Sequence, residues 1–246
     1  MKITIITATY NSAAHIANCI ESVNSQTYPN IEHIIIDGVS KDNTLEIINT
    51  TPNRVSKIVS EPDKGIYDAM NKGIRLATGD IIGTLNSDDT FYSPEALEQV
   101  AHTFEQHPEI DCLYGNLVFV NNEGKAVRRW QSRPFEPGLF AKSWSPGHPT
   151  FYCRREVFEK FGLYKTNYKI AADVEFMLRV MEVHCIKSYY LNKTLVRMSM
   201  GGVSTSGLQS TVTITREMHR AFKENGLPFN LPKYMFYKAL KLREFF

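Results

Sequence analysis

The stretch Asp80-Ile81-Ile82-Gly83-Thr84-Leu85-Asn86-Ser87-Asp88-Asp89 decides the fold of this 246-residue chain. Residues 80–85 are mostly apolar or β-branched and predict a buried strand, which opens into a polar turn. Two adjacent carboxylates at such a strand end repel each other and lose hydration. A hard cation such as Mg²⁺ or Mn²⁺, bridged to a diphosphate, would explain them. The alternative interpretation is a plain turn that caps the helix after Pro94.

Upstream of this stretch, short apolar strands alternate with amphipathic helices. Strands are predicted at 3–8, 31–36 and 56–60, and helices around 16–23, 45–48 and 66–77. Strands separated by helices of this length form a parallel sheet with right-handed crossovers. The sequence therefore predicts an α/β fold, with a mostly parallel central sheet flanked by helices. In such sheets ligands bind beyond the carboxyl ends of the strands.

Downstream the regular alternation ends. A helix to about residue 107 is followed by predicted strands at 111–121, 125–131 and 150–153, and by helices at 155–161 and 171–183. A loop rich in Pro and Gly separates the second of these strands from the third. No linker divides the chain, so one domain with a short appendage is expected.

Composition excludes several classes of protein. A net charge of +2 argues against a dedicated nucleic-acid binder, which would carry a clear basic excess. The four cysteines have no Cys-x-x-Cys spacing, so a zinc site or a disulfide framework is not expected. No run of about 18 apolar residues occurs, and the N-terminus passes directly into a strand pattern. We therefore expect a cytoplasmic protein that neither is secreted nor spans a membrane.

Polar residues gather at the predicted strand ends and in the loop that follows the third strand. Asp37 closes an apolar run and would accept hydrogen bonds from a base or ribose, unless it only forms a turn. Asp68 and Asn71, three residues apart on a helix, share a face and would clamp a loop or a ligand. A helix start rich in acids is also what the helix dipole favours.

Two later segments carry further candidates. Asp173 and Glu175 lie two apart on a predicted helix and point to different sides, so one faces a site while the other is solvated or pairs with Arg179. A carboxylate that deprotonates an alcohol is the role that the other motifs lack. A charged helix N-terminus is the alternative. His148 lies in a turn-rich loop, where a binding role and a structural role stay open.

Together, these motifs resemble family 2 glycosyltransferases of the GT-A fold. The resemblance is carried by 7–11, 35–38, 61–73 and 85–89, in that order and spacing. His148, Ala172-Asp173-Val174-Glu175 and Ser199 to Thr205 are similar to the bacterial exopolysaccharide branch, of the type that builds colanic acid repeat units. The resemblance covers roughly 1–205, with a nucleotide-binding half, 1–110, and an acceptor-binding half, 111–205. It leaves 206–246 as a C-terminal helical extension.

The resemblance implies an inverting enzyme that moves a sugar from a nucleotide-diphosphate donor, with a UDP-sugar favoured, to a glycan or lipid-linked glycan of the bacterial surface. It implies nucleotide binding by Thr7, Ala8, Thr9, Tyr10, Asn11, Asp37, Asp63, Lys64 and Asp88. It implies Mn²⁺ or Mg²⁺ on Asp89, Asp173 as the catalytic base, and donor-sugar or acceptor contacts from Asp68, Asn71, His148 and Glu175. Asn86 departs from the family pattern, which often has Asp there.

Two other functions stay open. A sugar-phosphate nucleotidyltransferase would show a Gly-rich, basic loop near the N-terminus, which residues 7–11 are not. A non-catalytic protein that binds nucleotide sugars would have no need of Asp173. The segment 231–246 mixes aromatic residues with Lys and Arg, as a helix does that lies on an anionic membrane. A polyprenyl-diphosphate-linked acceptor would place it there, whereas packing on the domain or a dimer interface is the alternative.

Overall fold

A nine-stranded sheet forms the centre of this computed structural model, which describes residues 1–121, 123–200 and 208–240. The strand order is β3-β2-β1-β4-β8-β6-β9-β5, and β7 pairs with β6. The strands are β1 (Ile3–Thr9), β2 (Ile31–Asp37), β3 (Val55–Ser60), β4 (Ile81–Thr84), β5 (Thr90–Phe91), β6 (Cys112–Val120), β7 (Ala126–Trp130), β8 (Tyr152–Arg154) and β9 (Ser188–Ser199). The sheet joins both halves of the chain.

Eight α-helices and three shorter helical turns surround the sheet in the part of the chain that is described. The α-helices are α1 (Ile16–Asn24), α2 (Thr44–Thr50), α3 (Ile66–Leu76), α4 (Ala96–Gln106), α5 (Arg155–Phe161), α6 (Ala172–Met177), α7 (Leu208–Glu224) and α8 (Leu231–Leu240). Two 3₁₀ turns are η1 (Phe140–Lys142) and η2 (His148–Thr150), and η3 (Leu178–Val183) is π-helical. The predicted helix 171–183 thus divides into α6 and η3.

The N-terminal strands are parallel and end together. β1 pairs with β2 from Ile3 opposite Ile31 to Thr9 opposite Asp37, and β4 joins the other edge of β1. Their carboxyl ends therefore open at the same edge of the sheet, as the alternation of strands and helices predicted.

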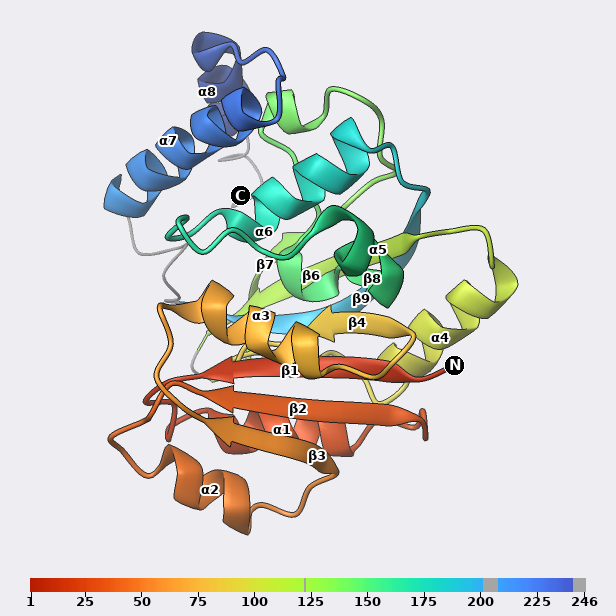
Figure 1. The fold of residues 1–246 in the computed structure, drawn as a ribbon, viewed down its shortest axis with the longest axis vertical. Coiled ribbons are helices and arrows are strands. Elements are labelled where there is room, and N and C mark those ends of the chain that lie inside the picture. Colours follow the sequence, from red (N-terminus) through yellow and green to blue (C-terminus); the bar gives the residue numbers. More distant parts are fainter. Residues whose placement is uncertain (122, 201–207, 241–246) are drawn as a thin grey trace.

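The side chains of β1 serve two cores, one on each face of the sheet. Ile3 and Ile5 pack with apolar residues of α1 and α4, whereas Ile6 and Ala8 pack with those of α3. Figure 1 shows α3 in front of the sheet and α1 behind it. A Cβ on Gly73 would lie 2.4 Å from Cγ2 of Ile6, so α3 approaches β1 more closely than a larger residue at this position would allow.

The second half of the sheet is mixed, and two of its strands, the short β5 and the long β9, were not predicted. β8 runs antiparallel to β4 and β6, but β9 runs parallel to β6 and lies between β6 and β5. β9 contains the exposed polar residues Asn192 and Lys193, and its only buried residues are Leu195 and Val196. The sequence of β9 shows neither a strict alternation of apolar and polar residues nor an apolar run, because other parts of the protein cover only part of the strand.

Helices α7 and α8 form the C-terminal extension and lie together beside α6, at the end of the molecule away from β2 and β3 (Figure 1). Met218, Phe222 and Tyr234 belong to the same core as Ile6, so the two helices pack on the sheet domain. The predicted boundary at 205/206 lies outside the described residues. Among the described helices, none combines the length and the apolar character that a bilayer span requires.

Candidate functional site

A cavity of about 1040 Å³ opens beyond the carboxyl ends of β1 and β4. Its first wall contains the loops that follow these strands and the start of α3. The second wall comes from the segments 140–149 and 169–174 and from helices α7 and α8. The lining of this cavity therefore joins chain segments that lie far apart in the sequence.

The loop after β1 presents Tyr10 to the cavity. Asn11 has a left-handed backbone (φ 49°), a conformation that Asn adopts more readily than most residues. Its Oδ1 accepts a hydrogen bond from the Lys41 amide at 2.7 Å, and its own amide donates to Ser40 Oγ at 2.9 Å. These bonds join the loops after β1 and β2. Tyr10 lines the cavity and keeps 58% of its surface exposed, as expected of a residue that awaits a ligand.

Asp37 and Thr7 lie beneath the cavity lining and not in it. Asp37 is buried, and its carboxylate accepts hydrogen bonds from the amides of Val39 and Ser40 and from the hydroxyls of Ser40 and Ser60. Thr7 Oγ1 lies 3.0 Å from His33 Nε2 in the core. Both residues form hydrogen bonds within the protein near the carboxyl ends of β1 and β2.

Asp63 lines the cavity and packs closely against Gly38. A Cβ on Gly38 would lie 2.5 Å from Asp63 Oδ2, so only a glycine leaves room for this carboxylate. Asp63 Oδ1 accepts from the Gly65 amide at 2.8 Å, which fixes the loop before α3. Lys64 is exposed, and its amide donates to Asp68 at 3.1 Å. Lys64 and Asp68 lie outside the described cavity lining.

The two adjacent carboxylates have different surroundings. Asp88 is half-buried and lines the cavity. Asp89 is 1% exposed, and its oxygens accept from the Ser199 amide and from Asn86 Nδ2, each at 3.3 Å. Burial, and then the charge of Asp88, raise the pKa of Asp89 well above its usual range. A cation beside the pair would oppose this effect.

The oxygen atoms around Asp88 fit a hard divalent cation. Asn86 lines the cavity, and its Oδ1 is buried without a hydrogen-bond partner among the described residues. Carboxylate and amide oxygens are ligands that Mg²⁺ and Mn²⁺ accept. In the described ranges no three Asp, Glu, His or Cys side chains gather into a metal site of their own. Mg²⁺ usually binds through one or two carboxylates together with substrate phosphates, so such a gathering is not required.

Asp173 faces the cavity from the start of α6. The Tyr67 hydroxyl donates to Asp173 Oδ1 at 2.9 Å and also contacts the carbonyl oxygen of Ile170. Burial, and then the charge of Asp173, raise the pKa of Tyr67 well above its usual range, so the phenol stays protonated and remains a donor.

His148 lines the same cavity as Asp173. Its Nε2 lies 2.9 Å from Thr84 Oγ1 at the end of β4. Burial lowers the pKa of His148, and the charge of Asp173 acts in the opposite direction. The imidazole is therefore neutral at pH 7, and a neutral imidazole both donates and accepts hydrogen bonds.

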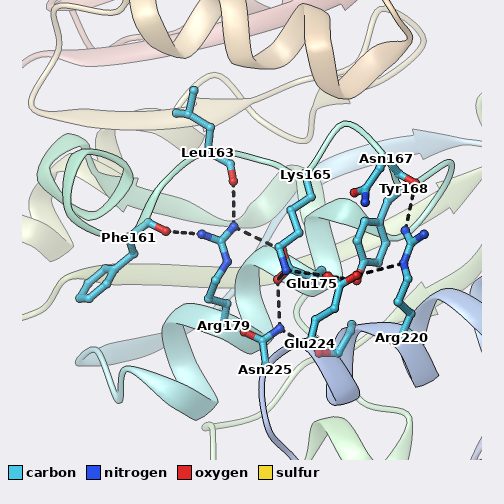
Figure 2. A network of polar contacts seen from close by, with 11 residues as sticks. Phe161, Leu163, Lys165, Asn167, Tyr168, Glu175, Arg179, Arg220, Glu224 and Asn225 are labelled. Carbon is cyan, nitrogen blue, oxygen red and sulfur yellow. Dashed lines mark hydrogen bonds and ion pairs between the residues drawn. The ribbon is translucent and has the colours of Figure 1, made fainter.

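Asn71 and Glu175 lie outside the cavity lining and hold the segment that carries Asp173. Asn71 is 2% exposed and forms two hydrogen bonds with the backbone of Tyr164, at 2.8 and 3.0 Å. Glu175 is fully buried between Lys165 at 2.9 Å and Arg179 at 3.3 Å (Figure 2).

The cavity also contains residues that sequence reasoning missed. Tyr67 lies inside a polar run that was recognised, and a buried aromatic at a helix start was the available signal. Lys169 and Lys238 carried no such signal, because each lines the cavity only through the packing of α6, α7 and α8.

Comparison with known proteins identifies the family of this chain. Residues 4–164 match the family model described as "Glycosyl transferase family 2", which is more than half of the chain. The chain belongs to glycosyl transferase family 2. This glycosyltransferase is 30% identical over 207 residues to a "PGL/p-HBAD biosynthesis glycosyltransferase" of Mycobacterium bovis, covering 82% of this chain and 78% of the relative. It is also 26% identical over 242 residues to an uncharacterized glycosyltransferase of Haemophilus influenzae, covering 93% and 81%.

Solved structures share the fold. S. aureus TarS in complex with UDP-GlcNAc has a TM-score of 0.70 and 20% identity, covering 90% of this glycosyltransferase and 66% of the TarS chain. The mannosyltransferase PcManGT from Pyrobaculum calidifontis, in complex with GDP-Man and Mn²⁺, has a TM-score of 0.64 and 19% identity, covering 98% and 75%. The chain thus spans about two thirds of the TarS chain. The predicted GT-A fold is confirmed.

Proposed function

We propose that this glycosyltransferase transfers a sugar, with inversion, from a nucleotide-diphosphate donor to a hydroxyl of a glycan or lipid-linked glycan, in the synthesis of a bacterial surface polysaccharide. The observation that carries the proposal is that Asp88 and Asp173 line the same cavity. Its volume lies at the upper end of the range that one ligand fills, so a donor and part of an acceptor fit together.

The donor half of the proposed site corresponds to residues 1–110. Ala8, Thr9, Tyr10 and Asp63 line the cavity and would surround the nucleoside. A UDP-sugar is the favoured donor, and the UDP-GlcNAc complex of TarS is consistent with this choice. The donor of PcManGT is GDP-Man, so a guanine nucleotide is the alternative to test.

We propose that Asp88 is the carboxylate that approaches the donor diphosphate, with Asn86 beside it. Sequence reasoning assigned the metal to Asp89, but Asp89 is buried behind the lining and already accepts two hydrogen bonds. A bound Mn²⁺ or Mg²⁺ would supply charge neutralisation for the leaving nucleoside diphosphate. Asp89 and Ser199 would keep the turn that carries Asp88 in place, because the Ser199 hydroxyl donates to the Asp88 carbonyl oxygen at 2.6 Å.

The proposed reaction is one in-line displacement at the anomeric carbon. The acceptor oxygen forms the new bond while the bond to the diphosphate oxygen breaks, which inverts the configuration. Asp173 takes the proton of the acceptor hydroxyl as that bond forms. Tyr67 holds one oxygen of Asp173, and His148 offers a neutral imidazole to a sugar hydroxyl. Arrangement within one cavity supplies the proximity that the displacement needs.

Residues 111–205, together with the helical extension, would form the acceptor half. α7 and α8 contribute Ile214, Met218 and Tyr234 to the cavity, and Lys238 lies beside them. Apolar side chains next to an ammonium group suit an acceptor that carries a lipid and a phosphate. We therefore favour a polyprenyl-diphosphate-linked saccharide over a free saccharide.

The outer face of α8 supports a contact with a membrane. Leu231, Met235, Phe236 and Leu240 are exposed on this helix, with Phe236 62% exposed. Apolar residues on an exposed helix face insert into the headgroup region of a bilayer. The proposed location is the cytoplasm, at the inner face of the cell membrane. Of the segment 231–246, residues 241–246 lie outside the described residues.

Sedimentation with anionic vesicles tests this contact. A doubly substituted protein, Leu231→Ser with Phe236→Ser, should lose binding to vesicles of phosphatidylglycerol, whereas Val212→Ser, an exposed apolar residue on α7, should keep it. Equal binding of the wild type and the double variant would remove the membrane role of α8.

Isothermal titration tests the donor site. UDP, GDP and dTDP are titrated with Mn²⁺ and with EDTA into wild type, Asp88→Ala and Asp89→Ala. We expect UDP to bind only with Mn²⁺ and to lose most of its affinity in Asp88→Ala. Asp80→Ala is the control, because Asp80 is exposed at the opposite end of β4.

Two results would contradict the proposed function. If no nucleotide binds with Mn²⁺, the proposed donor site is refuted. If the nucleotide binds but the corresponding nucleotide sugar is neither hydrolysed nor transferred to any acceptor in a membrane extract, the non-catalytic alternative replaces the proposed reaction.

A further inference from the structure

A buried carboxylate of α7 holds the backbone just ahead of Asp173. Glu217 is 8% exposed, and its two oxygens accept hydrogen bonds from the amides of Lys169 at 2.6 Å, Ile170 at 3.0 Å and Ala171 at 2.9 Å. These three amides are consecutive, and Asp173 follows two residues later. The C-terminal extension thus contacts the chain immediately before the proposed base.

α6 begins without a capping side chain of its own. Ala171 is the residue at the N-cap, and it supplies no side-chain cap, because alanine has no acceptor. Amides at a helix start favour a negative charge, and hydrogen bonds to a carboxylate are stronger than those between neutral groups. Glu217 therefore places a buried carboxylate at the N-terminal end of α6, bonded to the three amides that precede the helix.

A second set of contacts attaches α6 to the end of α7. The buried carboxylate of Glu175 accepts from Asn225 Nδ2 at 3.0 Å, just beyond the end of α7 (Figure 2). Lys165 bridges Glu175 and Glu224, at 2.9 and 2.8 Å. Asp173 thus lies on a short helix that α7 holds before its first turn and again along its length.

On the other side, Tyr67 donates to the Asp173 carboxylate from α3. The Tyr67 hydroxyl also contacts the carbonyl oxygen of Ile170, whose amide Glu217 binds. Glu217 of α7 and Tyr67 of α3 therefore bind the same peptide segment. Removing Glu217 leaves three amides without their acceptor and lets this segment move relative to Tyr67.

We propose that Glu217 is a positioning residue for Asp173, which sets the place of the proposed base through the backbone of residues 169–171. This inference rests on the proposed function, in which Asp173 takes the acceptor proton. It assigns to the helical extension a part in the reaction itself, although Glu217 is not a residue of the cavity lining in the described structure.

The test compares Glu217→Gln and Glu217→Ala with Lys223→Gln in the full-length protein. Lys223→Gln is the control, because Lys223 lies exposed on the same helix. We expect Glu217→Ala to lower kcat about 10- to 100-fold, since a displacement of about 1 Å can cost 10²-fold. Glu217→Gln, whose amide oxygen still accepts, should lose less. UDP affinity should stay within about twofold in both Glu217 variants, and Lys223→Gln should transfer at the wild-type rate.

A double-mutant cycle with Asp173→Asn separates positioning from a general loss of structure. If Glu217 acts through Asp173, Glu217→Gln lowers kcat in the wild-type background and has no further effect on the residual rate of Asp173→Asn. An equal loss in both backgrounds, or no loss in either, would overturn the inference. Where Glu217→Ala does not fold, Glu217→Gln carries the test, with thermal melting as the check on folding.

Other results would contradict the proposed function itself. These are a wild-type rate of transfer by Asp173→Asn, or no sugar transfer by the wild-type protein. A fall in kcat for Glu217→Gln that is equally large in the Asp173→Asn background would show that Glu217 acts on some group other than Asp173, and would reject this inference alone.

Discussion

Asp173 shares its site with a phenol that keeps its proton. The pKa of Tyr67 lies well above its usual range, so at neutral pH the hydroxyl is always available to the carboxylate. A single hydroxyl proton cannot serve Asp173 and the Ile170 carbonyl at the same moment, so the donor is shared between them. One carboxylate oxygen is thus held toward α3, and in the proposed reaction the other would take the proton of the acceptor hydroxyl.

Asp173→Asn should lower the rate of sugar transfer to a small residual value while donor binding remains. The amide is nearly the same size but has no basic oxygen, and general-base catalysis contributes about 10²- to 10⁴-fold. Initial rates of sugar transfer and UDP titration on the same preparation check this. Asp68→Asn, outside the cavity lining, is the control. Wild-type rates in Asp173→Asn would show that another group takes the proton.

Gly38→Ala should weaken nucleotide binding without unfolding the protein. The new methyl group would approach Asp63 Oδ2 to 2.5 Å, and the end of a side chain yields more easily than backbone. Asp63 would therefore turn away from the cavity. We expect a loss of about tenfold in UDP affinity, corresponding to one lost hydrogen bond of about 1 kcal/mol or more. Unchanged affinity, with an unchanged melting temperature, would show that Asp63 does not contact the nucleotide.

Sequence reasoning identified many polar residues of this region but not their partners. Asp88, Asp173 and His148 line the cavity, whereas Asp37 and Glu175 are buried and bound to protein groups. All five are polar residues at strand ends, in loops or at helix starts. A carboxylate that organises a loop and one that awaits a ligand have the same local sequence, and they differ only in what the fold places against them.

At the scale of elements, the parallel strands were predictable and the late strand was not. β1, β2 and β4 are covered on both faces, so their sequences are apolar and easily recognised. β9 pairs with β6 across more than 60 intervening residues, and its exposed middle contains Asn192 and Lys193. Pairing over that distance leaves no local signal. The end of β9 at Ser199 could therefore not be placed against Asp88 and Asp89.

The contact between β1 and β2 should make the protein sensitive to acid. Burial lowers the pKa of His33 from 6.5 to about 3, so the unfolded chain binds a proton that the folded chain refuses. Stability that is present above pH 6.5 is therefore lost as the pH falls toward 3, by roughly 3 kcal/mol between pH 7 and pH 4. Urea unfolding of the wild type and of His33→Gln checks this. The variant should lose less stability on acidification, and equal losses would assign the acid sensitivity to other groups.

At the scale of the whole molecule, the two halves and the extension act as one body. The core that contains Ile6 of β1 also contains Phe176 of α6 and Met218 of α7. The helices of the extension were foreseen from the sequence, but their part in the cavity was not. Which face of a helix meets a cavity depends on tertiary packing, and the apolar residues of α7 and α8 are compatible with several partners.

Thiol labelling should report whether the core of the native protein opens to a reagent. Cys19, Cys112 and Cys153 are buried, whereas Cys185 is exposed. Burial raises the pKa of Cys19 to about 12, and those of the other two buried thiols well above their usual range. We expect Ellman's reagent to modify one thiol in the native protein and all four after unfolding. The Cys185→Ser variant should show almost none. Rapid native labelling of a second cysteine would reveal an opening of the sheet core.

The position of β9 has a consequence for the order in which the site is made. Ser199 binds Asp88 and Asp89 from a place about 110 residues later in the chain. A ribosome that adds about 5 to 20 residues per second leaves the carboxylate turn without these partners for roughly 5 to 20 seconds. Glu217, which binds the backbone before Asp173, is synthesised later still. A nascent chain can therefore build its first three parallel strands early and yet hold no competent site until almost the whole polypeptide has left the ribosome, so translation itself delays the onset of sugar transfer.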